Sequence, residues 1–421
     1  MRRHLMFLAV VAAALAVASC GKRAESPAAP AGRPEAAAAA AQAAPVEVVL
    51  WHSYREGEKA AIEKLAAQFN ARDPALQVRL LNVPYDAFVD KVTIATPRGQ
   101  GPDLFIFAHN QIGEWVDRTH ILEPISEKVP PETLKRFIPQ TVKALVYKQS
   151  LYGLPLAFKS LALFVNPERV KALPDTAEQL AAAAKEATDK AAGRFGLAYE
   201  ASLLYFNAPF IHGFGGTILD AAGAPHVKEK PVADALAWVR GLVQAGVVPS
   251  GMSSAMVTSL FNEGKAAMVV SGPWFLGEIA KDRKFDVTIL PTMPGGQRAM
   301  PYLGSEALFL SAFSKHKDEA LKVMDFLTTD EAAMVRMQVG RQAAANAALY
   351  DRPEVKNDRV ITVFRGQAEN SVPMPSRPEM QAVWSTMDMA INRAVFGDVP
   401  PDKALEEAQS KIEADLAKMA K

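Results

Sequence analysis

The chain has 421 residues, which is room for two or three domains or for one domain with two lobes. Its 47 basic and 46 acidic side chains give a formal charge of +1, so bulk charge gives no reason to expect nucleic-acid binding. Hydrophobic residues make up 49% and charged residues 22%, which excludes a disordered or collagen-like chain. The single cysteine excludes an intrachain disulfide and a cysteine-rich zinc site.

The chain begins with the pattern of an export signal. Arg2 and Arg3 precede an apolar run over residues 5–18, shorter than the about 20 residues that a membrane-spanning helix needs. The run ends at Val17-Ala18-Ser19-Cys20-Gly21, which resembles the bacterial lipobox. We expect a signal peptide over residues 1–19 and a lipid on Cys20. The alternative is an ordinary signal peptide with an incidental cysteine.

An alanine- and proline-rich stretch follows over residues 20–45. It has no bulky apolar side chain, so it cannot bury enough surface to offset the entropy of ordering it. We expect a flexible tether, with a short helix at 36–44 as the alternative.

From residue 46 onward, strand patterns alternate with helix patterns. Short β-branched or apolar runs predict strands, and apolar residues at helical spacing predict the intervening helices. The first strands are expected at 46–51, 78–83 and 103–108, with helices at 57–71, from 86, and at 110–117. This order predicts an α/β fold with a mostly parallel sheet covered on both faces.

The later part of the chain alternates less regularly. Strands are expected at 154–158, 161–165, 266–272, 285–291 and 307–312. Helices are expected at 175–192, 231–246, 319–337 with a restart near 329, 380–397 and 404–420.

The residues after each strand matter because α/β sheets bind ligands beyond the carboxyl ends of their strands. These positions hold planar polar groups, charges and aromatic rings: His52 to Glu56, His109 to Gln111, Lys159, and Pro273 with Trp274. Such a set suits a polar ligand that also has apolar faces.

Six segments carry a resemblance to a known family. They are GPDLFIFAHNQIGEW (101–115), YGLPLAF with LALFVN (152–166), YFNAPFIHGFGG (205–216), FNEGKAAMVVSGPW (261–274), MPSRPEMQAVW (374–384) and ALEEAQSKI (404–412). In this order they resemble the periplasmic solute-binding proteins of ABC importers, specifically the maltose-binding-protein-like group, over most of residues 46–415.

The resemblance implies a periplasmic-binding-protein type II fold with two α/β lobes joined by a hinge. The first lobe would comprise residues 46–157 and 308–355, and the second 158–307 and 356–421. The ligand would bind in the cleft between them, and the closed form would deliver it to an ABC permease whose ATPase subunits are separate chains. The resemblance further implies an exported, periplasmic or cell-envelope monomer that uses no cofactor or metal and binds no nucleic acid.

The resemblance also implies ligand contacts. They are Arg55, Glu56, Phe107, Asn110 and Gln111 on the first lobe, Lys159 at the hinge, and Tyr205, Phe206, Trp274, Met374, Arg377 and Trp384 on the second lobe. Aromatic faces pack against the C–H faces of sugars. Adjacent aromatics on a helix cannot both face one way, so we favour Tyr205 over Phe206 as the contact.

The polar positions depart from the maltose-binding pattern. Arg55-Glu56 stand for an Asp-Lys pair, Asn110-Gln111 for Asp-Arg, Lys159 for Glu, Leu203-Leu204 for Glu-Pro, and Asp388 for Arg. We expect maltose, a maltodextrin or a related oligosaccharide as the ligand. Trehalose or another disaccharide stays open, as does an anionic solute such as a sugar phosphate, because Lys159, Arg55 and Arg377 are cationic.

An exported glycan-active enzyme is the alternative from a different class. A glycosidase needs two carboxylates across its cleft, and the strand ends offer mainly Glu56. The sequence contains no G-x-S-x-G, H-E-x-x-H or P-loop motif. His52 and His109 could meet as a metal pair, or each could bond to the backbone. The sequence does not separate a transport receptor from one that also reports to a chemosensor.

Overall fold

The structure is a computed structural model, and it describes residues 44–220 and 222–419. The predicted signal peptide, the lipidation site Cys20 and nearly all of the predicted tether lie outside the described residues. Within the described ranges, no helix is both long enough and apolar enough to cross a membrane.

The first large sheet contains the N-terminal strands. Its order is β12-β11-β3-β1-β2, with β6 also paired to β11. The bounds are β1 Val46–His52, β2 Leu76–Asn82, β3 Leu104–Ala108, β6 Gly153–Lys159, β11 Tyr302–Leu310 and β12 Val372–Pro373. Strands β2, β1 and β3 run parallel, as predicted, whereas β11 runs antiparallel to β3 and to β6.

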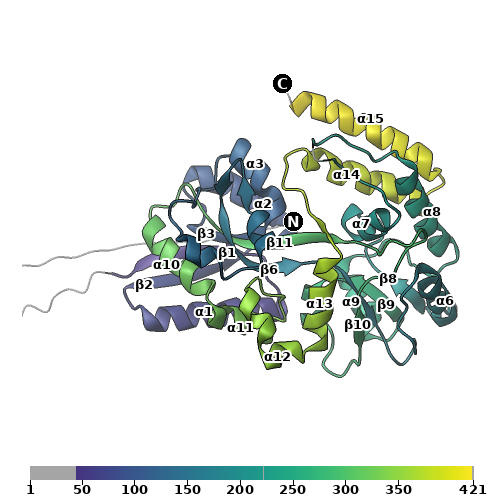
Figure 1. Cartoon of the computed structure of the whole chain (residues 1–421), viewed down its shortest axis with the longest axis horizontal. Helices are drawn as coiled ribbons and strands as arrows, with labels where there is room; N and C mark the ends of the chain where they lie inside the picture. The colour runs from purple at the N-terminus through teal and green to yellow at the C-terminus, as the bar shows by residue number, and fades with distance from the viewer. Residues whose placement is uncertain (1–43, 221, 420–421) are drawn as a thin grey trace, which may run out of the picture. The chain divides into compact units, whose positions relative to one another are not determined.

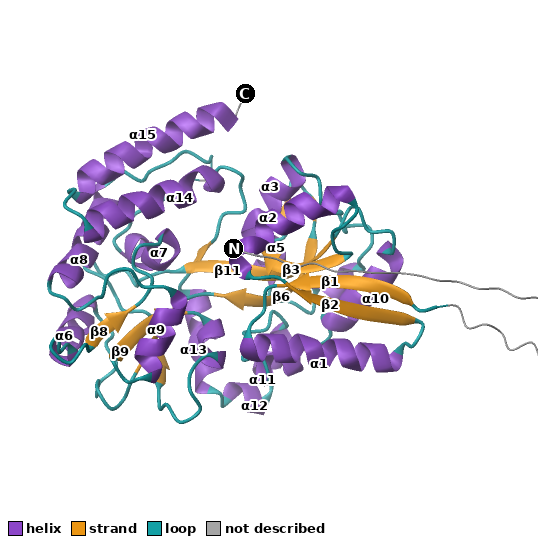
Figure 2. Cartoon of the chain, turned by 180° about the vertical axis from the view of Figure 1, so that it is seen from behind, coloured by secondary structure: helices purple, strands orange, loops and turns teal. Residues whose placement is uncertain are grey.

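Helices cover both faces of this sheet, which buries β3 completely apart from its last residue. In both views α2 and α3 lie on one side of β1 to β3, and α1 lies on the other (Figure 1, Figure 2). The bounds are α1 Glu56–Arg72, α2 Tyr85–Ala95, α3 Ile112–Asp117, α4 Pro131–Leu134, α5 Pro139–Lys143, α10 Lys317–Leu327 and α11 Asp330–Gln338. Thr329 caps α11 through its side chain, at the predicted restart.

The second large sheet has the order β10-β7-β9-β8. Its bounds are β7 Ala162–Val165, β8 Phe195–Ala198, β9 Ala266–Ser271 and β10 Asp286–Thr288. Only β8 and β9 are parallel, so this sheet is mostly antiparallel, in the part of the chain where the alternation of strands and helices is less regular. The chain enters it directly from the first sheet through β6, without the helical crossover that a parallel connection needs.

Helices also surround the second sheet, and α14 and α15 lie beside α7 and α8 (Figure 2). The bounds are α6 Ala177–Ala187, α7 Leu204–Gly213, α8 Lys230–Gln244, α9 Ser254–Asn262, α12 Pro353–Lys356, α13 Arg359–Glu369, α14 Met380–Ile391 and α15 Pro401–Met419. The predicted helix at 380–397 is α14 followed by a π-helical turn over Asn392–Phe396. A two-stranded sheet pairs β4 Val146–Tyr147 with β5 Ser150–Leu151.

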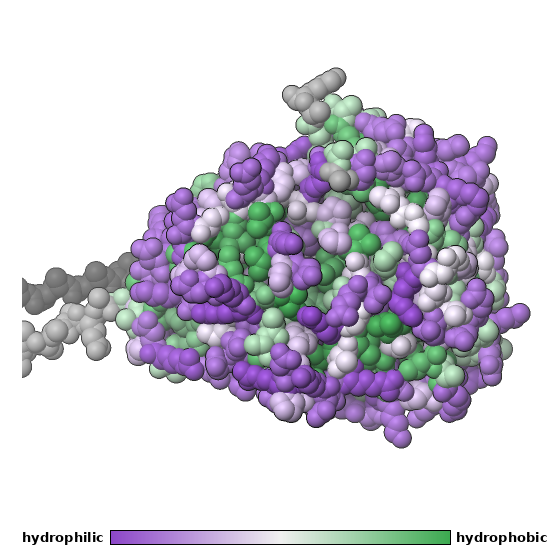
Figure 3. Space-filling model, in the orientation of Figure 1, coloured by the Kyte–Doolittle hydropathy of each residue, from purple (hydrophilic) through white to green (hydrophobic). Residues whose placement is uncertain are grey.

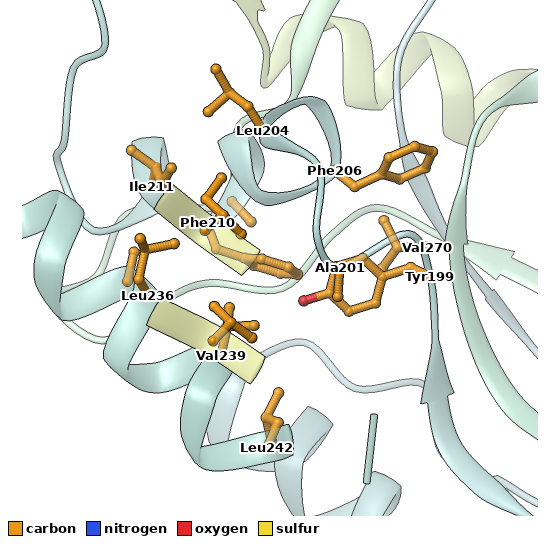
Figure 4. Close-up of a cluster of buried hydrophobic side chains, with 14 of the residues drawn as sticks. Tyr199, Ala201, Leu204, Phe206, Phe210, Ile211, Leu236, Val239, Leu242 and Val270 are labelled. Carbon is orange, nitrogen blue, oxygen red and sulfur yellow. The ribbon is translucent and has the colours of Figure 1, made fainter. Parts of the chain in front are cut away.

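Each large sheet has its own hydrophobic core. The first core includes Trp115, which is fully buried and lies edge-on to Phe105 at 5.2 Å between ring centroids. Figure 4 shows part of the second core, in which Phe210 and Ile211 of α7 lie near Leu236 of α8. The two largest clusters thus lie on different sheets, which meets the expectation of two lobes, since each lobe must bury an apolar face of its own.

The chain passes between the two sheets along β6 and β11, which pair side by side. Residues 343–345 run beside β6. The Phe158 N–H donates to the Ala343 carbonyl, and the Ala345 N–H donates to the Leu156 carbonyl. The predicted lobe boundaries at 157/158 and 307/308 fall inside β6 and β11, and their placement stays a prediction.

Candidate functional site

The candidate site lies where β6 and β11 leave the first sheet. Their register places Lys159 opposite Gly304, next to Glu306. On the face shown in Figure 3, hydrophobic residues gather in the middle and hydrophilic residues surround them. Both charged side chains and aromatic rings surround Lys159.

Lys159 is held by two carboxylates. Its Nζ lies 2.7 Å from Glu58 Oε1 and 3.0 Å from Glu306 Oε1. The Tyr54 hydroxyl donates to Glu306 Oε2 at 2.7 Å, and Gln342 Nε2 donates to both carboxylates at 3.2 Å. We call these five residues the hinge cluster. Sequence reasoning found Lys159 and noted Tyr54, but it missed the carboxylates and Gln342.

The electrostatics of the hinge cluster favour a charged lysine. Burial by itself would lower the pKa of Lys159, but Glu306 and Glu58 outweigh burial and raise that pKa. Burial raises the pKa of the Glu306 carboxyl, and Lys159 opposes the rise. One ammonium faces two carboxyl groups, so Lys159 presents no unpaired positive charge to a ligand.

Aromatic rings adjoin the hinge cluster. The Lys159 ammonium lies 5.7 Å from the ring centroids of both Tyr54 and Trp274, within the range of a cation–π contact. Trp274 lies 6.4 Å from Tyr205 between centroids. The local sequence fixes this position, because a side chain on Gly272 would come within 2.1 Å of the indole. The glycine thus lets the indole fold back over the end of β9.

A second pair of rings continues the aromatic surface. Trp384 of α14 lies 6.0 Å from Tyr302 between centroids, and both Trp384 and Tyr205 pack against the buried cluster of Ala208, Tyr302 and Met374. The structure therefore brings together four predicted site residues, Tyr205, Trp274, Met374 and Trp384, beside the predicted hinge residue Lys159. The indole Nε1 of Trp384 is buried and has no hydrogen-bond partner within the part of the chain that the structure describes. A ligand oxygen at this position could accept from it.

Two predicted aromatic contacts are covered by protein. Phe107 is 4% exposed and stacks on Phe88 and on Tyr85. Phe206 is 7% exposed and belongs to the second core. Figure 4 shows it on the side of α7 away from Ile211. Its neighbour Tyr205 is half-buried and packs against the cluster that contains Met374, so the two adjacent rings face different surroundings.

The predicted polar residues of the first lobe lie on two sides of this group. Arg55 is exposed and pairs with Glu278 of the second lobe at 3.4 Å, and exposed Glu56 adopts a left-handed backbone with φ 39°. Gln111 accepts from Gln381 Nε2 of α14 at 3.2 Å. Both glutamines line a cavity of about 420 Å³ between α2, α3, α14 and α15. Asn110 is half-buried beside Gln111.

Arg377 is engaged at the edge of the second lobe. Its guanidinium lies 3.1 Å from Glu379 and donates to the Ala222 carbonyl at 3.0 Å. The three cations that left an anionic ligand open, Lys159, Arg55 and Arg377, each have a carboxylate partner in the structure.

The two strand-end histidines each have backbone partners. His109 Nε2 lies 2.9 Å from the Met374 carbonyl, and its Nδ1 accepts from the Ser305 N–H at 3.0 Å. His52 Nδ1 accepts from the Tyr54 N–H at 3.2 Å. Among the described residues no group of His, Cys, Asp and Glu is arranged to hold a metal ion.

Comparison with known proteins agrees with this architecture. The family model for bacterial extracellular solute-binding proteins matches residues 53–334, which is more than half of the chain. A maltotriose-binding protein of Pyrococcus abyssi is 29% identical over 385 residues, covering 88% of this chain and 82% of its own. A maltooligosaccharide ABC transporter solute-binding lipoprotein of Streptococcus pneumoniae is 25% identical, with 86% of this chain and 87% of its own length covered.

A solved structure is similar as well. It is the Thermus thermophilus maltotriose binding protein bound with maltotriose, which superimposes with a TM-score of 0.81 at 26% identity. The likeness covers 88% of this chain and all of that one. The predicted two-lobed α/β fold of the binding-protein type is confirmed.

Proposed function

The chain belongs to the family of bacterial extracellular solute-binding proteins, and we propose that it is the non-catalytic binding subunit of an ABC importer for a neutral maltooligosaccharide. The relatives named for maltotriose and maltooligosaccharides support the ligand class. The observation that carries the proposal is the aromatic surface of Tyr205, Trp274 and Trp384 beside a lysine whose charge is already paired.

The pairing of the cations favours a neutral ligand over a sugar phosphate. An anion at Lys159 would have to compete with Glu58 and Glu306 for the same ammonium. A sugar requires no net charge from the site. Its ring offers C–H faces to the aromatic side chains, and its hydroxyls can accept from groups such as Trp384 Nε1.

Delivery would follow from closure of the two lobes. A ligand drives closure only if it binds the closed state more tightly than the open state, which requires contacts to both lobes. The proposed contacts meet that requirement, with Arg55, Glu56, Asn110 and Gln111 on the first lobe and the aromatic surface on the second. The closed form would dock on permease subunits, with ATP hydrolysis on separate chains.

We propose no catalysis. Glu58 and Glu306, the carboxylates of the hinge cluster, are both occupied by the same ammonium. A glycosidase instead uses one carboxyl as the proton donor and the other as nucleophile or base on opposite sides of the bond. Incubation with maltotriose should therefore yield no shorter sugar.

Export and anchoring complete the proposal. We propose that the signal peptide over residues 1–19 is removed, that Cys20 carries a lipid, and that residues 20–45 tether a monomeric body to a membrane of the cell envelope. The Streptococcus pneumoniae relative, described as a lipoprotein, supports this. Mass spectrometry of the mature N-terminus tests it, since an unmodified Cys20 would contradict it.

A thermal-shift panel on the full-length protein tests the ligand. Maltose, maltotriose and longer maltodextrins should raise the melting temperature, whereas trehalose and glycerol 3-phosphate should not. A ligand at 100 times its dissociation constant stabilises the folded state by about 2.7 kcal/mol. Trp274→Ala should abolish the shift. Trp238→Ala, which removes a ring packed on Phe210 in the second core, should keep it. If only anionic compounds raised the melting temperature, the proposed ligand class of neutral maltooligosaccharides would be wrong.

A further inference from the structure

Tyr85 is an aromatic residue that is not among the predicted ligand contacts. It begins α2 and is 58% exposed, more than any other large hydrophobic side chain that the structure describes. Single exposed aromatics are common and need no explanation. Tyr85 differs because its ring belongs to an ordered stack.

The stack contains three rings of the first lobe. Phe107 of β3 stacks on Phe88 at 4.8 Å with an interplanar angle of 9°, and Tyr85 stacks on Phe107 at 5.1 Å and 24°. Phe88 and Phe107 are buried, so Tyr85 is the exposed member. Phe107, which the resemblance places in contact with the ligand, is therefore covered, and the aromatic surface that solvent can reach belongs to Tyr85.

The stack is next to the hinge cluster. Surrounding protein desolvates the Tyr85 hydroxyl and raises its pKa, while the positive charge of Lys159 opposes the rise. Tyr85 also contributes to the raised pKa of Tyr205 on the second lobe, after burial. Geometry places it there as well, because Tyr85 stacks on Phe107 at the end of β3, and β3 pairs with the part of β11 that carries Glu306 of the hinge cluster.

We propose that Tyr85 is the first-lobe platform for a sugar ring of the ligand, in the role that the resemblance assigns to Phe107. The inference rests on the proposed function. The buried rings of Phe88 and Phe107 hold Tyr85 in place, which lowers the entropy lost when a sugar stacks on it. A ligand between Tyr85 and Trp274 would contact both lobes with aromatic surface, and such a ligand favours closure.

Titration calorimetry with maltotriose on the full-length protein tests the role. We expect Tyr85→Ala to raise the dissociation constant about 3- to 10-fold, and Tyr85→Phe to stay within about 2-fold because the ring is kept. Tyr85→Leu keeps an apolar cover over Phe107 but has no flat face, so it should behave like Tyr85→Ala. Phe313→Ala is the matched control, since Phe313 is an aromatic residue of the first lobe, 45% exposed, beyond the far end of β11.

The outcomes separate the two proposals. If the wild type binds maltotriose and both Tyr85→Ala and Tyr85→Leu bind it equally well, the role of Tyr85 is refuted and the proposed function stands. If the wild type binds no maltooligosaccharide, the proposed function fails and the role of Tyr85 fails with it. A loss of affinity in Phe313→Ala as large as in Tyr85→Ala would also overturn the inference, because the effect would not be local.

Discussion

The backbone N–H of Leu204, the first residue of α7, donates a 2.6 Å hydrogen bond to Asp388 Oδ1 on α14. Both positions depart from the maltose-binding pattern, which has a proline at the first and an arginine at the second. A proline has no N–H, so this bond requires both departures. It places a carboxylate at the positive end of α7. The two changes therefore form one structural contact between helices.

The bond can be isolated with a pair of variants at one position. Leu204→Pro and Leu204→Ala both remove the leucine side chain, but only the proline removes the N–H. Proline is tolerated at the first helical residue, and Leu203 already has the extended backbone that precedes proline. We expect Leu204→Pro to have a free energy of unfolding about 1–2 kcal/mol below that of Leu204→Ala, measured in urea. Equal stabilities would mean that the bond contributes nothing.

The hinge cluster predicts a large effect of one substitution. Lys159→Met leaves Glu58 and Glu306 together without their cation, so we expect the free energy of unfolding to fall by about 3 kcal/mol. Adding Glu58→Gln and Glu306→Gln to that variant should recover most of the loss. The control is Lys59→Met, which breaks an exposed pair with Glu63 and should cost less than about 1 kcal/mol. Similar losses of unfolding free energy in Lys159→Met and Lys59→Met would contradict the role of Lys159 as the buried partner of both carboxylates.

Trp384 should show opposite effects on stability and binding. Trp384→Phe removes a buried N–H that has no partner among the described residues, so the unliganded protein should be as stable as the wild type or slightly more stable. If a ligand oxygen accepts from that N–H, the dissociation constant for maltotriose should rise about tenfold. Calorimetry and urea unfolding on the same preparation give both values. Unchanged affinity would exclude the indole N–H as a ligand contact.

Because His52 is buried, we expect the folded protein to lose stability in acid. It is 1% exposed, and burial, followed by the charge of Lys59, lowers its pKa to about 4. The unfolded chain takes up this proton near pH 6.5 and the folded protein only near pH 4, so folding disfavours the protonated form. The contribution is complete above about pH 6.5 and is lost progressively down to about pH 4, by about 3 kcal/mol.

The variant His52→Asn tests this sign. Its side chain cannot titrate in this range but keeps an oxygen that can accept from the Tyr54 N–H. The stability advantage of the wild type over His52→Asn, from urea unfolding at several pH values, should shrink as the pH falls from 7 to 4. A constant difference across that range would show that His52 is not the titrating group.

Sequence periodicity and strand-end position were sufficient to predict most elements and part of the site. Alternating patterns place β1, α1, β2 and β3 within a few residues of their bounds, because these patterns depend on local burial. Lys159 and Trp274 were expected to face a ligand because each follows a predicted strand. In the structure the Lys159 Nζ lies 5.7 Å from the centroid of the Trp274 ring. The resemblance supplied the two-lobed fold, which no local pattern could predict.

Only the tertiary structure decided which charges are paired and which rings are exposed. Tyr54 and Glu306 are 252 positions apart in the chain, and they meet because β11 returns beside β3, the neighbour of β1, as well as beside β6. The same return supplies the second carboxylate of Lys159, which is one of the three cations that had left an anionic ligand open. Phe107 is covered because Phe88 and Tyr85 of α2 pack on it. A sequence pattern reports neighbours a few residues apart, whereas pairing and exposure depend on the surfaces that distant segments bring together.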